Sequence, residues 1–212
     1  MELSSSKTKL QVYTPSNLSV PQVNLLKNSA QLNIDGSTIE FVDIAEHVGV
    51  VRSVDGNLPH ILNRLTSHNR ALHGILSVGL ARGHKANPAA SLRVEKIYGL
   101  PVLLSGTSSL NLKSSEVTIL NQHYKNKLQN LQKLYDKTPE SVVYFLAGSL
   151  PAEALLHLRQ LSLFSMICRL PDNILNRIAR YILTTAKENS TSWFVSISKL
   201  CSLYGRAVRI WI

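Results

Sequence analysis

The sequence predicts an α+β fold, mainly α, with a small antiparallel β-hairpin or sheet near its N-terminus. Three observations predict it. Apolar and polar residues alternate with a period of two up to residue 52, the period lengthens to 3.6 after Gly56, and prolines and glycines then separate several helical segments. The composition is globular, with 44% hydrophobic and 17% charged residues in a chain of 212. We expect a β-rich segment at 7–52 and helices joined by short connections from about residue 55 onward.

Short patterns define the β-rich segment. The dipeptide Asp35-Gly36 separates alternating arms in "QLNIDGSTIEFVDI", which predicts a hairpin with a tight turn. The stretch "HVGVVRS" predicts a further short strand, with Gly49 at a bulge or at a close approach of another backbone. The first strand-like stretch, "KTKLQVY", has no evident partner in the chain, so we expect it to be an unpaired edge.

Two amphipathic helices are the strongest elements of the helical part. The first begins after Gly56, and its apolar residues recur with a period of 3.6. Its stripe consists of Leu58, Ile61, Leu62, Leu65, Leu72, Ile75, Leu76 and Gly79. The second covers about 115–135, and we expect its stripe to pack on the other C-terminal helices. That stripe consists of Val117, Leu120, Tyr124, Leu128, Leu131 and Tyr135.

Capping residues mark the remaining helix boundaries. Asn87 can cap a helix whose first position is Pro88, because an asparagine side chain accepts from free N–H groups and proline lacks one. Further helices are expected to open near Pro139, Pro151 and Pro171, and the last to stop at Gly205.

The net charge of +10 is the first observation that bears on function. By segment, the net charge is −2 for residues 1–50, +5 for 51–100, +2 for 101–150 and +5 for 151–212. A basic body favours a polyanionic partner, most often nucleic acid, with an anionic membrane as a lesser option. The simplest alternative is that the charge only keeps the protein soluble.

Cysteine content and hydropathy indicate an intracellular protein. Cys168 and Cys201 alone do not make a disulfide framework, and no basic-then-apolar signal pattern opens the chain. The longest apolar stretch, "VVYFLAGSLPAEALLHL", is broken by Pro151, Glu153 and His157. It predicts two buried helices rather than a membrane span, so no membrane partner is expected.

No residue set predicts a self-contained active site. The acidic residues are scattered, and no pair has the spacing of a two-metal site or an acid–base pair. The histidines include no H-x-x-x-H, and His68 and His73 would lie on different faces of their helix. The glycine-rich phosphate-binding motifs are missing too. We therefore expect no catalytic residue, no metal ligand and no cofactor in this chain.

The densest group of cations lies in "GLARGHKANPAASLRVEK", a predicted loop between two helices. It holds Arg82, His84, Lys85, Arg93 and Lys96, and Arg64 is five helical turns from Arg82 on the same side of the preceding helix. Such a loop can present side chains to phosphates. A solvated connector is an equally good interpretation of the same residues. Since aromatic residues are few nearby, backbone contact is expected rather than base stacking.

The order of elements resembles the end of the palm and the thumb of a reverse transcriptase of the non-LTR (LINE-type) retrotransposon class. In that family, a stretch of the type N-x-x-K-T-K-x-x-V-F follows the strands that bear two catalytic aspartates. "SSSKTKLQVY" matches it at Lys7, Thr8, Lys9, Val12 and, by residue type, Tyr13.

A second motif carries the same resemblance. The family's primer-grip strand, Y-L-G-V, is similar to "HVGVV", which matches at Gly49 and Val50 and has Val48 where leucine is usual. The later segments "RGHKANPAASLRVEKIYG" and "SWFVSISKLCSLYG" are similar to regions beyond the thumb. The resemblance covers nearly the whole chain.

The resemblance implies a palm remnant at 1–52, a thumb-like domain at 53–112 and a C-terminal extension at 113–212. Lys7 or Lys9 would stand where a lysine is proposed to protonate pyrophosphate, and residues 48–50 would hold the primer end. The five cations Arg64, Arg82, His84, Lys85 and Arg93 would contact an RNA–DNA duplex backbone. The aspartate pair that binds Mg²⁺ in the family does not occur in this sequence, so we expect a C-terminal fragment without polymerase activity of its own.

A different class of function is also consistent with the sequence. The helix at 115–135, with Lys125, Lys127 and Lys133 on its outer face, can dock a protein partner. The chain would then be a helical protein–protein interaction module with no nucleic-acid role. In the first hypothesis the partners are an RNA–DNA duplex and the upstream part of the polymerase.

Overall fold

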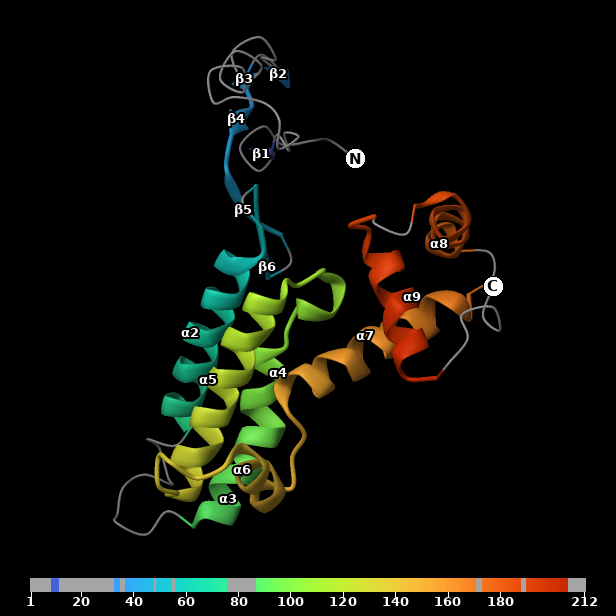
Figure 1. Ribbon diagram of the computed structural model, residues 1–212. Coiled ribbons are helices and arrows are strands. Elements are labelled where there is room, and N and C mark those ends of the chain that lie inside the picture. Colours follow the sequence, from blue (N-terminus) through green and yellow to red (C-terminus); the bar gives the residue numbers. More distant parts are fainter. Residues whose placement is uncertain are drawn as a thin grey trace. The chain divides into compact units, whose positions relative to one another are not determined.

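The computed structural model confirms the α+β class, with short strands first and helices after them (Figure 1). It describes residues 9–11, 33–34, 37–47, 49–54, 56–75, 87–170, 173–187 and 190–205. The chain divides into two compact units, 1–60 and 61–212. The boundary expected at 112 falls within the second unit.

The first unit contains three strand pairs. The pairs are β1 (Lys9–Leu10) with β4 (Glu40–Phe41), β2 (Asn33–Ile34) with β3 (Ser37–Thr38), and β5 (Ile44–His47) with β6 (Val50–Ser53). The last two pairs are antiparallel hairpins. Ile34 pairs with Ser37, so the hairpin expected around Asp35-Gly36 is present, although these two residues lie outside the described part.

The first strand differs from expectation because it has a partner in the chain. Lys9 pairs with Glu40 and Leu10 with Phe41 in a parallel register, and the Leu10 carbonyl accepts a hydrogen bond from Val42 N–H at 3.0 Å. The Gln11 amide donates to the carbonyls of Asp43 and Arg52. The expectation of an unpaired edge is therefore wrong: the backbone N–H of Val42 and the carbonyls of Asp43 and Arg52 bind this segment, and local patterning does not reveal such partners.

Gly49 also differs from its expected position inside a strand. His47 pairs with Val50, so Gly49 lies in the two-residue connection between β5 and β6, and its φ of 73° is in the left-handed region. Glycine enters that region without the steric cost of a Cβ atom, which explains its place in a hairpin turn. Only Val50 of the primer-grip-like residues 48–50 is in a described strand, and Val48 lies outside the described residues.

Helices form the second unit, and α2 leads into it from the first. The helical elements are α2 (Leu58–Ile75), α3 (Pro88–Val94), the π-helical η2 (Glu95–Gly99), α4 (Leu100–Leu103), the 3₁₀ turn η3 (Thr107–Ser109), α5 (Ser114–Gln132), α6 (Glu140–Ala147), α7 (Ala152–Cys168), α8 (Ile174–Thr185) and α9 (Trp193–Leu203). Helices begin at the expected residues wherever the structure describes those residues. Asn87 Oδ1 accepts from Ala89 N–H at 3.0 Å with Pro88 next to it, and Pro139 and Pro151 immediately precede α6 and α7.

The main core joins α4, α5, α6 and the start of α7. Its fully buried members include Leu103 and Leu104 before the expected boundary at 112, and Leu120, Tyr124 and Leu128 after it. Leu65 of α2 packs against the same core. The stripe of α5 is thus used inside this unit, as we expected.

A second, smaller core lies between α7, α8 and α9. Phe164 packs with Ile197 and Cys201, and Leu183 packs on them from α8. Trp193 Nε1 donates to the Ser108 carbonyl at 3.0 Å, and the Asn111 amide donates to the Thr191 carbonyl at 3.0 Å. These bonds attach α9 to the segment that precedes α5.

Two stripe predictions need correction. Ile61 and Leu72 of α2 are buried, but Leu58 and Leu62 are 42% and 51% exposed. The buried face of α2 in the second unit includes His68 instead, because the tertiary structure supplies partners for its ring nitrogens. On α5, Tyr135 lies beyond the end of the helix and is 74% exposed.

The end of α5 explains the exposure of Tyr135. Lys133 has φ 57° and is the one non-glycine residue with positive φ in the described part of the chain. A left-handed residue after a helix is usually glycine, and a side chain there costs about 1–2 kcal/mol. Leu134 N–H donates to the Gln129 carbonyl at 3.0 Å and its side chain packs on the main core, so the turn is firmly held.

None of the described helices is by itself long and apolar enough to cross a membrane; α6 and α7 taken together meet that criterion, with a bend of 58° between them.

Candidate functional site

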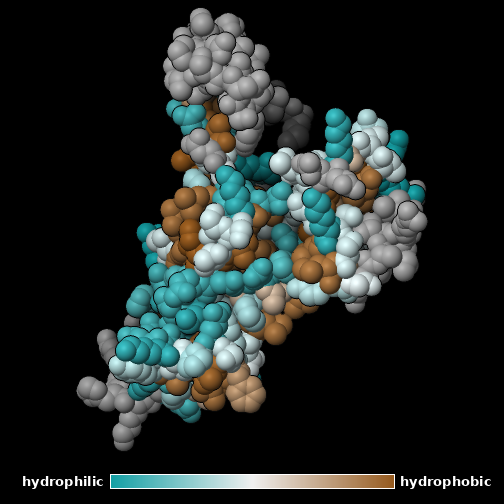
Figure 2. Space-filling model, viewed as in Figure 1, coloured by the Kyte–Doolittle hydropathy of each residue, from teal (hydrophilic) through white to brown (hydrophobic). Residues whose placement is uncertain are grey.

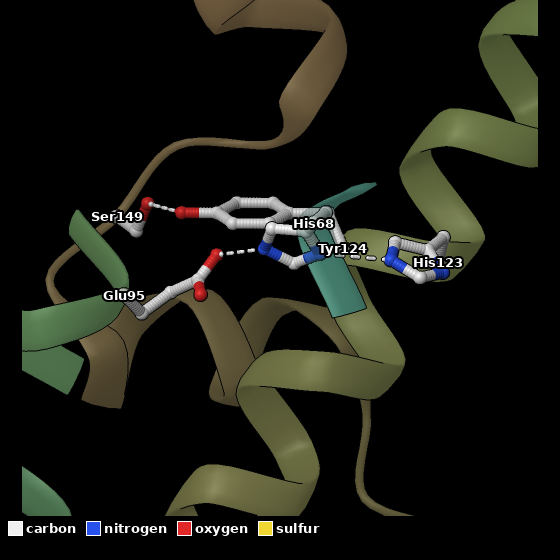
Figure 3. A network of polar contacts seen from close by, with 5 residues as sticks. All are labelled: His68, Glu95, His123, Tyr124 and Ser149. Carbon is white, nitrogen blue, oxygen red and sulfur yellow. Dashed lines mark hydrogen bonds and ion pairs between the residues drawn. The ribbon is translucent and has the colours of Figure 1, made fainter. Parts of the chain in front are cut away.

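A buried polar network connects three elements of the second unit (Figure 3). His68 of α2 lies at its centre. Its Nε2 is 2.9 Å from Glu95 Oε1 of η2, and its Nδ1 is 2.9 Å from His123 Nε2 of α5. His68 and Glu95 are fully buried, and His123 is half-buried. With Glu95 ionised, Nε2 carries the proton and donates it, because a carboxylate only accepts.

Glu95 occupies its position because η2 is wound more widely than an α-helix. The Leu100 N–H donates to the Glu95 carbonyl five residues earlier, which is the π-helical pattern. The carboxylate folds over Gly99, where a Cβ atom would lie 2.2 Å from Glu95 Oε2 and 3.0 Å from His68 Nε2. Only a residue without a side chain leaves room for the pair. Oε2 has no hydrogen-bond partner among the described residues.

Tyr124 lies beside the network on α5. Its hydroxyl is 2.8 Å from Ser149 Oγ, in the connection between α6 and α7 (Figure 3). Burial raises the pKa of Tyr124 to about 12, and the Glu95 carboxylate adds to the increase while the Ser149 bond opposes it. Tyr124 therefore remains a neutral phenol that joins α5 to the start of α7.

The network holds helices together and offers no enclosed reaction site. Glu95 and His68 have no exposed surface, so a substrate cannot touch them. Glu95, His68 and His123 bond in a row rather than around a common point, and no group of three or more potential metal ligands is found in the part of the chain that the structure describes. The network instead fixes the orientation of the partly exposed His123 on α5.

Burial makes His123 sensitive to acid. Burial lowers the pKa of His123 to about 4, with further lowering by His68 and by Lys127 one turn away. Its unfolded value is about 6.5. The unfolded chain therefore binds more protons than the folded protein between these two values, and this contribution to stability is lost as pH falls from about 6.5 through about 4.

We expect His123→Asn to reduce the acid sensitivity of folding. Urea unfolding measured at about pH 7 and about pH 4 gives the loss of unfolding free energy for each protein, and the loss is expected to be smaller in the variant because asparagine does not titrate. An equal loss in the two proteins would contradict the assignment to His123. His73→Asn is the matched control, because His73 is an exposed histidine on α2.

The described lysines and arginines of the second unit lie at its surface. Figure 2 shows hydrophilic residues over the lower part of the face formed by α2 and α5. In the described part of 61–212, none of the lysines and arginines is buried: Arg64, Arg70, Arg93, Lys96, Lys113, Lys125, Lys127, Lys133, Lys137, Arg159, Arg169, Arg177, Arg180, Lys187 and Lys199. No lysine or arginine in that set forms an ion pair with a described carboxylate. Among the described residues of this unit, only His68 and Glu95 lie at ion-pair distance.

Carboxylates are few on the same surface. Glu95 and Glu116 are buried, and Glu116 accepts from the Lys113 backbone N–H at 2.7 Å to cap α5. Asp136, Glu140 and Glu153 are exposed. Burying two of its five described carboxylates leaves this surface more positive than its composition alone suggests.

Two of the five predicted duplex-binding cations are described. Arg93 is exposed on α3, and Arg64 is half-exposed on α2 with its Nε enclosed and without a partner among the described residues. Arg64 is on α2 together with His68, and Arg93 is on α3, two residues before Glu95. Arg82, His84 and Lys85 lie outside the described residues, as does Lys7 of the palm-like motif. Lys9 is exposed in β1 of the first unit.

Sequence reasoning missed the polar network. His68 was considered only as a metal ligand together with His73, and Glu95 as one of several scattered acids. The available signal was a histidine on the apolar stripe of α2, since a polar residue at such a position needs a partner from elsewhere in the fold. Comparison of the chain with protein-family models, curated proteins and solved structures gives no match.

Proposed function

We propose that residues 61–212 bind the sugar–phosphate backbone of nucleic acid, in the way that the part of a non-LTR reverse transcriptase beyond its catalytic centre holds an RNA–DNA duplex. The charge of the two units supports this. Residues 61–212 contain 19 Lys and Arg against 7 Asp and Glu, a net charge of +12, whereas residues 1–60 contain 4 against 6, a net charge of −2.

The observation that carries the proposal is the shortage of accessible carboxylates. Fifteen described cations of this unit reach solvent, against three exposed acids. A surface kept soluble by charge alone intersperses both signs. One dominated by a single sign attracts a polyanion and holds it through phosphate contacts that do not depend on base sequence.

The proposed role is binding without chemistry. Arg64 and Arg93 would contact phosphates, with Arg82, His84 and Lys85 from the intervening segment. The sequence lacks the adjacent aspartates that hold Mg²⁺ in the family it resembles, so we assign no phosphoryl transfer to this chain.

Binding to a labelled RNA–DNA hybrid at two salt concentrations tests the proposal. With phosphate contacts from the four arginines and lysines of this set, the association constant is expected to fall on the order of 150-fold between about 50 and about 200 mM salt, because each such contact releases condensed counterions. Arg93→Gln is expected to weaken binding and to reduce the salt slope by about one. Arg52→Gln in β6, an exposed arginine of the acidic first unit, is expected to change neither.

Two results would reject duplex binding. One is no binding at low salt, and the other is binding whose affinity does not change with salt.

The alternative, a helical interaction module, has one specific observation in its favour. The helix α8 buries Asn176 and Ala179 but leaves Ile174, Ile178 and Tyr181 exposed at 68%, 41% and 69%. The stripe of α5, in contrast, is occupied by the main core and is not available to a partner. A protein that does not bind nucleic acid at any salt concentration would favour this alternative.

A further inference from the structure

Tyr135 is an exposed aromatic side chain on a tightly held turn. It lies between α5 and α6, and 74% of its surface is accessible. Its carbonyl accepts hydrogen bonds from the Gln129 amide, the Thr138 hydroxyl and the Thr138 N–H. Leu134, immediately before it, packs on the main core. The backbone on both sides of the ring is therefore fixed before any ligand arrives.

Two exposed lysines flank this ring. Lys133 precedes it by two residues and Lys137 follows it by two. Lysines near the end of a helix also complement the helix dipole, so their presence alone does not indicate a ligand. Lys133, however, occupies a left-handed position where glycine is the unstrained choice. Neither the helix dipole nor packing explains why residue 135 is a tyrosine. The turn uses its backbone carbonyl, whereas its ring is exposed.

An exposed ring with a lysine two residues away on each side in the chain matches the chemistry of single-stranded nucleic acid. The π-face of any base stacks on an aromatic side chain, and the adjoining phosphates are attracted to the cations. Asp136 is exposed in the same turn and leaves it with a net charge of +1. Inside a duplex the faces of each base are covered by the neighbouring base pairs, so an unpaired base suits such a ring best.

We propose that Tyr135, flanked by Lys133 and Lys137, is a stacking site for one unpaired base of a single-stranded RNA or DNA segment. The proposal rests on the proposed nucleic-acid binding and extends it, because it adds a single-strand contact to a surface otherwise suited to backbone contacts. In a template–primer, the segment would be a single-stranded extension of the duplex.

Anisotropy of a labelled oligo(U) and a labelled oligo(dT) with the full chain tests the site. Tyr135→Ala is expected to weaken binding of at least one of the two by about 5- to 150-fold with an unchanged salt slope, since stacking is lost but no charge is. Tyr135→Phe is expected to stay within about two-fold of the original protein, because the ring face remains. The two oligonucleotides show whether the site prefers RNA or DNA.

Tyr181→Ala is the matched control. Tyr181 is similarly exposed, at 69%, but lies on the apolar face of α8. If the protein binds single strands and Tyr135→Ala binds as tightly as Tyr181→Ala, the stacking site is wrong while the proposed backbone binding stands. If the unaltered protein binds neither oligonucleotide nor hybrid, both proposals fail together. Unchanged circular dichroism and melting temperature show that the variants are folded.

Discussion

His68→Ala is expected to destabilise the protein by about 3–5 kcal/mol, because it leaves the Glu95 carboxylate buried without its partner. The side chains of both residues are 0% exposed, so the carboxylate has no bulk solvent beside it to compensate for the lost hydrogen bond. For a chain of this size, the melting temperature is expected to fall by about 10 °C. Chemical and thermal unfolding at neutral pH measure both quantities.

Two further variants show whether the buried carboxylate is the cause. His73→Ala, on the exposed side of α2, is expected to change stability by less than about 0.5 kcal/mol. In the His68→Ala background, Glu95→Gln removes the unpaired charge and is expected to be neutral or stabilising, although the same change alone is destabilising. A His68→Ala protein within about 1 kcal/mol of the original would show that the pair contributes little.

The His68–Glu95 pair could not be predicted from the sequence, although several local features could. The starts of α3, α6 and α7 and the hairpin between β2 and β3 were predicted, because Asn87, the prolines and the Asp35-Gly36 dipeptide act on their own neighbours in the chain. His68, however, bonds to residues 27 and 55 positions away. Hydrophobic periodicity identifies a buried face but does not tell which distant polar group will satisfy a histidine on it.

The errors at Leu62 and Tyr135 have similar causes. Leu62 has the spacing of the α2 stripe but lies at the edge of that stripe and is half-exposed. His68 lies in the middle of the buried face because Glu95 forms a hydrogen bond with it there. Tyr135 continues the α5 stripe in spacing, but the helix ends at Gln132 and the left-handed Lys133 redirects the chain. Helix ends set by a non-glycine residue in that conformation are the hardest to predict, because the usual signal is missing.

Only the sign of the surface charge could be predicted from the sequence. The sequence shows the excess of lysine and arginine, but the burial of Glu95 and Glu116 follows from tertiary structure. Each is buried for a local reason, one to pair with His68 and the other to cap α5. Three of the predicted phosphate-contacting residues lie outside the described part of the chain, so their role stays a prediction.

Gly99→Ala is expected to destabilise the protein by about 2–3 kcal/mol, although alanine is the better helix former by about 1 kcal/mol. The new Cβ atom would lie 2.2 Å from Glu95 Oε2 and 3.0 Å from His68 Nε2. The carboxylate is the end of a side chain and can move, but moving it breaks the buried bond to His68, which is worth more than the gain in helix propensity. Urea unfolding of the variant measures the net effect.

Two comparisons separate this clash from an effect of glycine replacement in general. Gly74→Ala in α2, where nothing lies within 4 Å of the new Cβ, is expected to stabilise by up to about 1 kcal/mol. In a Glu95→Ala background the carboxylate is gone and only the tight contact with His68 Nε2 at 3.0 Å remains, so most of the cost of Gly99→Ala is expected to disappear. That loss of cost depends on the carboxylate lying over Gly99, and a Gly99→Ala cost that persists in full without Glu95 would mean that another contact requires the glycine.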